Sequence, residues 1–293
     1  MTTINLIETP VASDDANYDV ELYQHTGEKI WRYNDRLHRT GGPAVITPEG
    51  TQTWYQHGNR HRDDGPAVIC LDGHKEWWQN DVRHRDDGPA VIHANGNEEW
   101  WANGELHRIG APAIRRPDGR YEWFNEGIRH RSDGPAVIYP NGTLEWYTDG
   151  RPHRTDGPAI EHADGYKIWK FNGRTHRSDG PAIQWSDGSE EWWLNGDRHR
   201  IDGPAIRRPD GTEEWYLIDR LHRLDGPAVT HANGFQAWYV AGQHHRIDGP
   251  AIVHANGNLE WWMHDSRYSF EHWLSWLSPK DQTLAVLKYG DRA

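Results

Sequence analysis

Residues 192–214 read WWLNGDRHRIDGPAIRRPDGTEE, and this stretch contains the pattern that decides the fold. Its His-Arg dipeptide occurs ten times at a constant step of 23 residues, from position 38 to position 245. Its first Trp recurs in the same register from position 31 to position 261, and its Pro-Ala from position 43 to position 250. A fixed period of this kind is the signature of a repeat architecture. The chain is therefore predicted to be an array of ten to eleven 23-residue repeats.

Each repeat carries two turn signals and two strand signals. Asp-Gly or Asn-Gly, as at Asn141-Gly142, suits a tight hairpin because Gly tolerates positive φ. A short strand leads to the Trp, a loop is expected from Asn103-Gly104 through His-Arg to Asp-Gly, and a second strand starts at Pro-Ala. Short connections between short strands favour antiparallel pairing. We predict an all-β fold, an elongated repeat array of antiparallel β-hairpins in a meander, with short C-terminal helices.

The two faces of the strands are predicted to differ, because side chains alternate along a strand. The first Trp of each repeat and the Val or Ile after Pro-Ala are expected to share one buried face. The next aromatic residue, as in Trp101, shares the opposite face with a Glu that recurs at seven positions. That face is expected to be half exposed, with only Ala beside the rings. The residue three positions before the turn glycine varies most, from Thr47 to His254. This position either determines which partner binds or is exposed and unconstrained.

Both ends of the chain depart from the repeat. Residues 1–26 are expected to form an N-terminal segment and half-repeat cap, with residues 1–18 loosely held and Leu22 near the Val/Ile position. Residues 27–265 hold the repeats, and residues 266–293 form a helical cap or docking segment. Repeat arrays need their open ends covered, which favours the cap.

The C-terminal segment is predicted to contain two helices. Apolar residues at helical spacing mark the first one: Phe270, Trp273, Leu274 and Leu277. Ser278-Pro279 offers an N-cap and a first-turn proline for the second. Its buried residues are predicted to be Leu284, Leu287 and Val286.

Composition and charge exclude several functions. The formal net charge is −12 and there is no long basic run, so direct binding to nucleic acid or anionic lipid is not favoured. Cys70 is the single cysteine, which fits a reducing compartment. The first residues lack the basic and apolar regions of a signal peptide, and no apolar run is long enough to span a membrane. We expect a cytoplasmic protein.

Catalytic and metal sites are not predicted. The repeated His residues lie about 10 Å apart by strand spacing, too far to share a metal ion; each is expected to bond a loop carbonyl. Each repeated Arg is expected to pair with the Asp two residues later, as Arg200 with Asp202. No Ser or Cys nucleophile motif and no phosphate-binding Gly loop is present. The sequence predicts no enzyme, no cofactor and no metal.

The repeat resembles the MORN repeat, which is also 23 residues long. The shared features are an aromatic-x-Asn-Gly-x-x-His stretch (Trp101, Asn103, Gly104, His107) and a later Asp-Gly (Asp118, Gly119). His-Arg-x-Asp-Gly-Pro-Ala stands where the usual motif has His-Gly-x-Gly, so the chain is similar to the divergent MORN-variant class. The resemblance implies an antiparallel hairpin array and a scaffold or binding role. MORN-variant proteins of bacteria include antitoxin-like members, which implies neutralisation of a partner.

The leading hypothesis is a non-enzymatic scaffold or inhibitor that binds a protein partner along an extended aromatic and acidic surface. Two alternatives remain open: an array that binds carbohydrate or a lipid headgroup, and an acidic mimic of nucleic acid. The candidate binding residues are the aromatic side chains Tyr55, Trp78, Trp101, Phe124, Tyr147, Trp193, Tyr216, Tyr239, Trp262, Trp185, Trp273 and Trp276.

Overall fold

The computed structural model describes residues 19–23 and 27–292, and it is almost entirely β. Its strands form an antiparallel meander of hairpins, and helix occurs only near the C-terminus. The predicted fold class, an all-β hairpin array with short C-terminal helices, is confirmed. The expectation for residues 1–18 lies outside the described residues.

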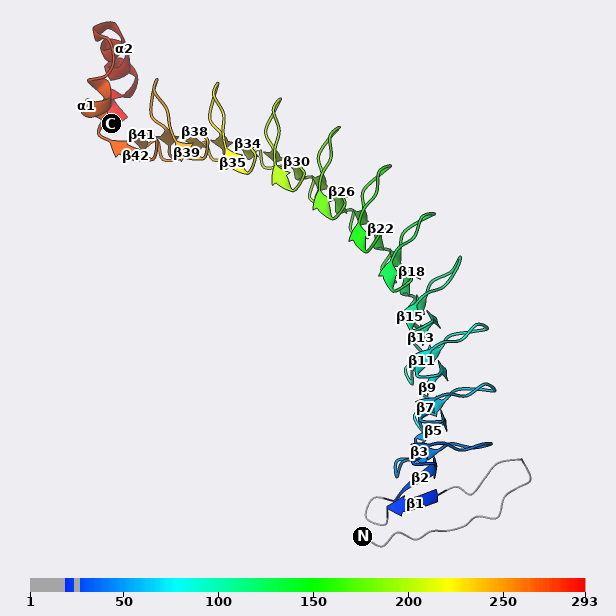
Figure 1. The fold of residues 1–293 in the computed structure, drawn as a ribbon. Coiled ribbons are helices and arrows are strands. Elements are labelled where there is room, and N and C mark those ends of the chain that lie inside the picture. The colour runs from blue at the N-terminus through cyan, green and yellow to red at the C-terminus, as the bar shows by residue number, and fades with distance from the viewer. Residues whose placement is uncertain (1–18, 24–26, 293) are drawn as a thin grey trace. The chain divides into compact units, whose positions relative to one another are not determined.

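The chain divides into two compact bodies, Met1–Gly150 and Arg151–Ala293. We call them the N-terminal body and the C-terminal body and describe each by itself. The division falls inside the repeat array and not at its ends. Within each body the hairpins follow one another in chain order (Figure 1). Repeats are numbered from the one that begins at Trp31, so that repeat four begins at Trp100 and repeat eight at Trp192.

Each repeat contains a small hairpin that the sequence analysis took for a loop. In repeat four, β14 (Trp101–Ala102) pairs with β15 (Glu105–Leu106). The turn residues Asn103 and Gly104 have φ of 51° and 83°. Positive φ at both central residues defines the type I′ turn, which Asn-Gly favours. The Asn-Gly signal was therefore a hairpin signal, and the prediction of a loop was wrong.

A second hairpin in each repeat builds the main sheet. In repeat four it consists of β16 (Ile114–Arg115) and β17 (Tyr121–Glu122), joined by the turn that contains Asp118-Gly119. The neighbouring hairpins continue the ladder, since β13 (Glu98–Glu99) pairs with β16. This is the hairpin that the Asp-Gly signal predicted.

The remaining strands repeat these two patterns. The main-sheet strands are β4 (Val45–Ile46), β5 (Gln52–Thr53), β8 (Val68–Ile69), β9 (Lys75–Glu76), β12 (Val91–Ile92), β20 (Val137–Ile138), β21 (Leu144–Glu145), β24 (Ile160–Glu161), β25 (Lys167–Ile168), β28 (Ile183–Gln184), β29 (Glu190–Glu191), β32 (Ile206–Arg207), β33 (Glu213–Glu214), β36 (Val229–Thr230), β37 (Gln236–Ala237), β40 (Ile252–Val253) and β41 (Leu259–Met263). The small-hairpin strands are β6 (Tyr55–Gln56), β7 (Asn59–Arg60), β10 (Trp78–Gln79), β11 (Val82–Arg83), β18 (Phe124–Asn125), β19 (Ile128–Arg129), β22 (Tyr147–Thr148), β23 (Arg151–Pro152), β26 (Lys170–Phe171), β27 (Arg174–Thr175), β30 (Trp193–Leu194), β31 (Asp197–Arg198), β34 (Tyr216–Leu217), β35 (Arg220–Leu221), β38 (Tyr239–Val240) and β39 (Gln243–His244).

The N-terminal strands also form hairpins. β1 (Asp19–Tyr23) pairs antiparallel with β2 (Glu28–Tyr33), and β2 pairs in turn with β3 (Arg36–Leu37). The half-repeat that was predicted here therefore starts the array. Its register is shifted by one residue from the repeat, because Glu21 and not Leu22 lies opposite Ile30.

The predicted sharing of one face by the first Trp and the Val or Ile is wrong. Val91 pairs with both Glu99 and Glu76 across the sheet, and residues opposite one another point to the same face. The first Trp shares a face with the Ala instead, since Trp100 lies opposite Ala113 and its amide donates to the carbonyl of Ala113 at 2.8 Å. The Val/Ile row therefore lies on the face of the Glu residues, and the Ala row lies with the first Trp.

The most deeply buried side chains come from these two rows. The Ala of every Pro-Ala, from Ala44 to Ala251, is 0% exposed. Val91 and Val137 are 2% and 0% exposed. Most of the first Trp residues are only half-buried, and Trp31, Trp100 and Trp261 are buried. The scaffold thus has two thin buried rows in place of one thick core.

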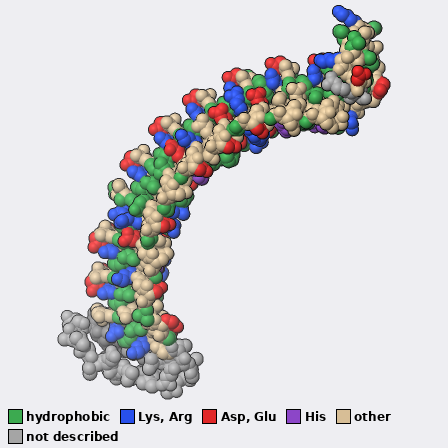
Figure 2. Space-filling model, turned by 180° about the vertical axis from the view of Figure 1, so that it is seen from behind, with side chains coloured by type: hydrophobic (Ala, Val, Ile, Leu, Met, Phe, Trp, Pro, Cys, Tyr) green, Lys and Arg blue, Asp and Glu red, His purple; other side chains and the backbone are tan. Residues whose placement is uncertain are grey.

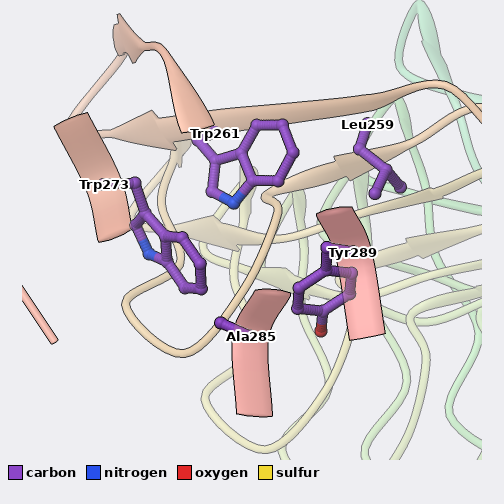
Figure 3. Close-up of a cluster of buried hydrophobic side chains, with 5 residues drawn as sticks. All are labelled: Leu259, Trp261, Trp273, Ala285 and Tyr289. Carbon is purple, nitrogen blue, oxygen red and sulfur yellow. The ribbon is translucent and has the colours of Figure 1, made fainter. Parts of the chain in front are cut away.

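The C-terminal helices cover the last repeat. α1 (Phe270–Leu274) and α2 (Pro279–Tyr289) follow β42 (Ser266–Tyr268), and η1 (Gly290–Arg292) ends the described chain. The Trp273 and Tyr289 side chains lie against Trp261 and Leu259 in one buried cluster (Figure 3). Ser278 caps α2 through a hydrogen bond from the amide of Asp281. The helices therefore cover apolar side chains of the last repeat.

The predicted buried face of α2 is wrong. Ala285 and Tyr289 are buried, whereas Leu284 and Leu287 are 56% and 80% exposed and Val286 is also exposed. Residues four apart lie on the same face of a helix, and the large ring of Tyr289 fixes which face meets the array. An apolar helix face is therefore left exposed.

Candidate functional site: the aromatic and acidic face

The carboxylates of the predicted surface are held by side chains of the chain itself. Glu99 accepts a hydrogen bond from the indole of Trp101 at 2.9 Å, and its other oxygen lies 2.9 Å from Nε2 of His93. Glu214 is held in the same way by the hydroxyl of Tyr216 at 3.0 Å and by Arg208 at 2.7 Å. We call a Glu with these donors a Glu clamp. The aromatic side chains donate to the Glu two residues earlier, so the two rows do share a face.

The variable position completes the Glu clamp. His93, Arg116, Tyr139, Trp185, Arg208 and His254 differ in shape, but each places an N–H or O–H group 2.7–3.2 Å from the Glu six residues later. Where this residue is His162 or His231, the Glu is replaced by Ile168 or Ala237. In the Cys70 repeat the donor is His74 instead, at 3.0 Å. In these repeats the side chain at this position always supplies a hydrogen-bond donor, whatever its shape. The position is therefore constrained by the fold, and its donor is not available to a partner.

Glu122 shows how the clamp adapts. The aromatic residue two positions later is Phe124, which has no hydrogen-bond donor. Arg129 takes its place at 2.6 Å, and Arg116 and Arg120 lie 3.2 and 3.0 Å from the other oxygen. Glu122 is only 2% exposed, which three guanidinium groups make tolerable for a carboxylate.

The predicted binding residues occupy three environments. Most are half-buried rings in Glu clamps or against the Val/Ile row, as Tyr239 and Trp262 pack on Val229 and Ile252. Trp78 is 8% and Trp273 1% exposed, so neither offers much surface to a partner. The exposed members of the set are Trp185 and Trp276. The shallow trough of Ala beside large rings does not exist, because the neighbours on this face are Val and Ile.

The clamps also govern the protonation of the face. Burial and the neighbouring Glu214 carboxylate raise the pKa of Tyr216 to about 12. Hydrogen bonds from His74 and Trp78 outweigh the burial of Glu76 and lower the pKa of its carboxyl. The phenol therefore stays protonated and the carboxylate charged at neutral pH, which is what a clamp of donor and acceptor requires.

A ladder of Arg side chains covers the first Trp row. The guanidinium carbon of Arg200 lies 4.0 Å from the ring centroid of Trp192, and Nε of Arg200 donates to Asp202 at 3.0 Å. A second donor, Nη1, reaches the carbonyl of Pro204 at 3.3 Å. The predicted Arg–Asp pair is confirmed in eight repeats, and these hydrogen bonds from Arg lower the pKa of the Asp carboxyls, as at Asp202. The Arg ladder therefore shapes the loop and shields the Trp.

The His ladder links successive repeats, but not as predicted. Nδ1 of His84 accepts a hydrogen bond from the amide of Asn103 in the next repeat at 3.1 Å. The same bond, 19 residues apart, joins His153 to Asn172 and His176 to Asn195. The expected partner was a carbonyl; the observed partner is an amide, because the positive-φ turn residue turns its N–H toward the imidazole.

Three consecutive repeats of the C-terminal body carry an exposed apolar residue that the sequence did not predict, whereas in the N-terminal body Ile109 alone is apolar at this position. The residue after His-Arg is Ile201, Leu224 and Ile247 in repeats eight to ten, and these side chains are 83%, 80% and 64% exposed. The second residue after the first Trp is apolar in every repeat of this body: Phe171, Leu194, Leu217, Val240 and Met263. In the N-terminal body the latter position holds Tyr33, Gln56, Gln79, Ala102, Asn125 and Thr148.

The two positions lie beside one another. In the C-terminal body, Phe171 lines a shallow groove together with Thr155 and Ser178, which lie on the loops of two successive repeats. A groove in the N-terminal body places Gln56 in the same way between Thr40 and Asp63. The repeat therefore places Leu217 between Ile201 and Leu224, and Val240 between Leu224 and Ile247. We call these five residues the apolar stripe.

Charge does not mark a site of its own. Acidic and basic side chains stand side by side along the hairpins in the view of Figure 2. Among residues 19–23 and 27–292, no group of three or more His, Cys, Asp or Glu side chains could hold a metal ion. No helix in this part of the chain is long and apolar enough to cross a membrane. No known protein family and no curated protein matches this chain.

Proposed function

We propose that the protein is a non-catalytic repeat scaffold that binds a protein partner through the apolar stripe of its C-terminal body. The observation that carries the proposal is the contrast between equivalent positions. Leu224 is 80% exposed, while the equivalent residue in repeat three is Asp86. The scaffold folds with either residue, so folding does not require the apolar one.

The stripe has the character of an interaction surface. Exposed apolar side chains in a contiguous row are rare on monomeric proteins and mark contact sites. The flanking carboxylates of Asp202 and Asp225 are 84% and 81% exposed, which gives the stripe a polar rim. A partner with an apolar ridge and basic or neutral borders suits this arrangement. The inhibitor role and the cytoplasmic location that the MORN-variant resemblance and the composition suggest belong to the same proposal.

The aromatic and acidic face is a weaker candidate for binding. Its carboxylates and ring donors are engaged in Glu clamps, as Glu191 is by Trp193 and Trp185 at 2.9 and 3.0 Å. A sugar or peptide that used these groups would first have to break the clamps. The face is better explained as the part of the scaffold that holds successive repeats together.

A matched pair of variants tests the proposal. Wild-type protein is immobilised and exposed to an extract of the native host, and bound proteins are quantified by mass spectrometry. We expect a partner that the double variant Ile201→Asp/Leu224→Asp loses at least about tenfold, the scale of one lost apolar contact in an interface. The control Asp63→Ser/Asp86→Ser changes the same two positions in the N-terminal body and should keep the partner. Equal retention by the stripe variant, with unchanged circular dichroism, would refute the proposal.

A further inference from the structure

Two loops of the array lack the acid that the other eight share: repeat one has Gly41 at this position, and repeat four has Gly110. In eight repeats Nε of the ladder Arg lies 2.7–3.0 Å from an Asp oxygen two residues later. Repeat four reads Arg108-Ile109-Gly110-Ala111, so Gly stands where the Asp belongs. The Arg is retained although its partner is lost.

The Arg108 side chain keeps the two other side-chain contacts of the ladder, those with the first Trp and with the Pro carbonyl. Its guanidinium carbon lies 3.9 Å from the ring centroid of Trp100, and Nη1 donates to the carbonyl of Pro112 at 3.3 Å. Within the part of the chain that the structure describes, Arg108 forms no ion pair. Burial and the nearby Arg115 lower the pKa of Arg108 by more than the carboxylate of Glu98 raises it, and Glu98 itself pairs with Arg115 at 3.4 Å.

Repeat eight shows what the loop looks like with its acid. The guanidinium carbons of Arg200 and Arg207 lie 4.0 and 5.7 Å from the ring centroid of Trp192. Those of Arg108 and Arg115 lie 3.9 and 5.9 Å from the ring centroid of Trp100. The residue after the ladder Arg is Ile in both repeats. The loops differ at two positions: Asp202, whose carboxylate lies 3.0 Å from Arg200, is replaced by Gly110 with φ of 68°, and Gly203 is replaced by Ala111.

The backbone leaves room at the missing acid. Gly110 has φ of 68°, and a Cβ at this position would meet no atom within 4 Å. The side chain of Ile109 next to it is 89% exposed. An incoming group therefore finds open space, a fixed guanidinium and an apolar neighbour.

We propose that Arg108, held over the ring of Trp100 and flanked by Arg115, is a binding site for a carboxylate supplied from outside the chain. The carboxylate takes the place that Asp202 has in repeat eight and accepts a hydrogen bond from Nε of Arg108. Its source is an Asp or Glu side chain of a protein segment or a free small carboxylate. The site lies in the N-terminal body and is independent of the apolar stripe.

The test follows the Nε–H resonances of the Arg side chains by NMR on uniformly ¹⁵N-labelled full-length protein, with the Arg108 signal assigned from Arg108→Lys. Sodium acetate is titrated against sodium chloride at equal ionic strength. We expect a saturable shift of the Arg108 resonance at about 10–100 mM acetate, since one partly exposed charge-assisted hydrogen bond is weak. The Arg200 resonance, already paired with Asp202, should not move.

A variant that restores the acid provides the control. Gly110→Asp/Ala111→Gly gives the loop the sequence Ile-Asp-Gly-Pro that repeats eight and ten contain. It should show the paired resonance position without acetate and no further shift. The peptide acetyl-Asp-Gly-amide distinguishes the sources: binding about tenfold tighter than acetate assigns the site to a protein segment, and equal binding assigns it to small carboxylates. A wild-type Arg108 signal that ignores acetate and peptide, or that moves together with all other Arg signals, overturns the proposal.

Discussion

The N-terminal and C-terminal bodies are built from one repeat, yet they present different side chains at two positions. The ladder of Ala, Trp, Arg and His runs through both, and the Ala residues are 0% exposed in each. The residue after His-Arg is polar in the first body except at Ile109, and it is apolar in three consecutive repeats of the second body, at Ile201, Leu224 and Ile247. Because the scaffold is constant, it serves as an internal control. A residue type that differs between equivalent positions of the repeat is not demanded by the fold.

A second kind of variation has the opposite meaning. The variable position is His, Arg or Tyr in three repeats of the N-terminal body and Trp, Arg or His in three repeats of the C-terminal body, and in these six it pairs with the Glu six residues later. Hydrogen-bonding capacity is the property that the scaffold requires there. Variation in residue type therefore indicates a free surface only when the contacts change as well, as they do along the apolar stripe.

The largest difference that we expect between the bodies comes from the C-terminal cap. Trp273 is 1% exposed, packs on Trp261 and Tyr289, and donates from its indole to the carbonyl of Ile247 at 2.9 Å. Trp273→Ala should cost about 3–5 kcal/mol, the range for a buried Trp. The loss should appear as faster hydrogen exchange in the C-terminal body alone. Trp276→Ala, which removes a half-exposed ring, should cost about 1 kcal/mol or less; equal losses would show that α1 does not cap the array.

The Glu clamps of the N-terminal body should differ in strength. Glu122 has three Arg partners and is buried, whereas Glu145 receives only the hydroxyls of Tyr139 and Tyr147. Glu122→Leu leaves partly exposed guanidinium groups without their counter-charge and should cost about 2–3 kcal/mol after discount for solvent.

The matched variant Glu145→Leu removes two ordinary hydrogen bonds and should cost about 1 kcal/mol. Urea unfolding of both variants measures the difference. A Glu145→Leu loss as large as that of Glu122→Leu would contradict the idea that the Arg residues replace the missing aromatic donor of Phe124.

Lowering the pH should destabilise the two bodies to different extents. Hydrogen bonds from the ladder Arg lower the pKa of Asp carboxyls at three positions in the N-terminal body (Asp64, Asp87, Asp133) and five in the C-terminal body (Asp156, Asp179, Asp202, Asp225, Asp248). A carboxyl with a lowered folded-state pKa stabilises the fold above its unfolded pKa of about 3.9 and loses that contribution as the pH falls through the folded value. The C-terminal body, with more pairs, should lose protection more steeply below about pH 4.

Hydrogen exchange between pH 5 and 3, corrected for intrinsic rates, measures this loss in each body. Gly110→Asp/Ala111→Gly adds a fourth pair to the N-terminal body and should steepen its response. A response that is equal in both bodies and insensitive to that variant would mean that the Arg–Asp pairs set the loop shape without affecting stability.

Much of the architecture could be predicted from the sequence because the period is exact and the turn residues are explicit. Asn-Gly and Asp-Gly fix hairpins through the φ of Gly, and Ser278-Pro279 marks the start of α2. The Arg–Asp pairs were predictable because both partners lie in one short loop. The small hairpin was missed although its Asn-Gly was visible, since strands of two residues carry almost no alternation signal.

Faces and partners could not be predicted in the same way. The face of Val91 depends on the hairpin register, and a shift of one residue reverses every assignment. The His partner depends on where the next repeat turns its amide, which no pattern within one repeat records. The Glu clamp could have been predicted, because an aromatic residue lies two positions after the recurrent Glu. The repeats that have Thr53, Ile168 or Ala237 in place of the Glu have no clamp.

The smallest expected effect on stability provides the sharpest test of the comparison between the bodies. Leu224→Asp replaces an 80% exposed side chain by the residue that repeats two and three already carry at this position. Surface changes of this kind stay within about 0.5 kcal/mol, and the neighbouring Arg223–Asp225 pair at 2.9 Å does not involve the Leu side chain. The urea midpoint should therefore match wild type, while binding of a fluorescent apolar dye to the C-terminal body falls. Asp86→Leu, the reverse exchange in the N-terminal body, should also leave the midpoint unchanged and raise dye binding. A clear drop in the urea midpoint for Leu224→Asp would show that the Leu224 side chain packs against the scaffold. That result would contradict the proposal that the apolar stripe is a binding surface.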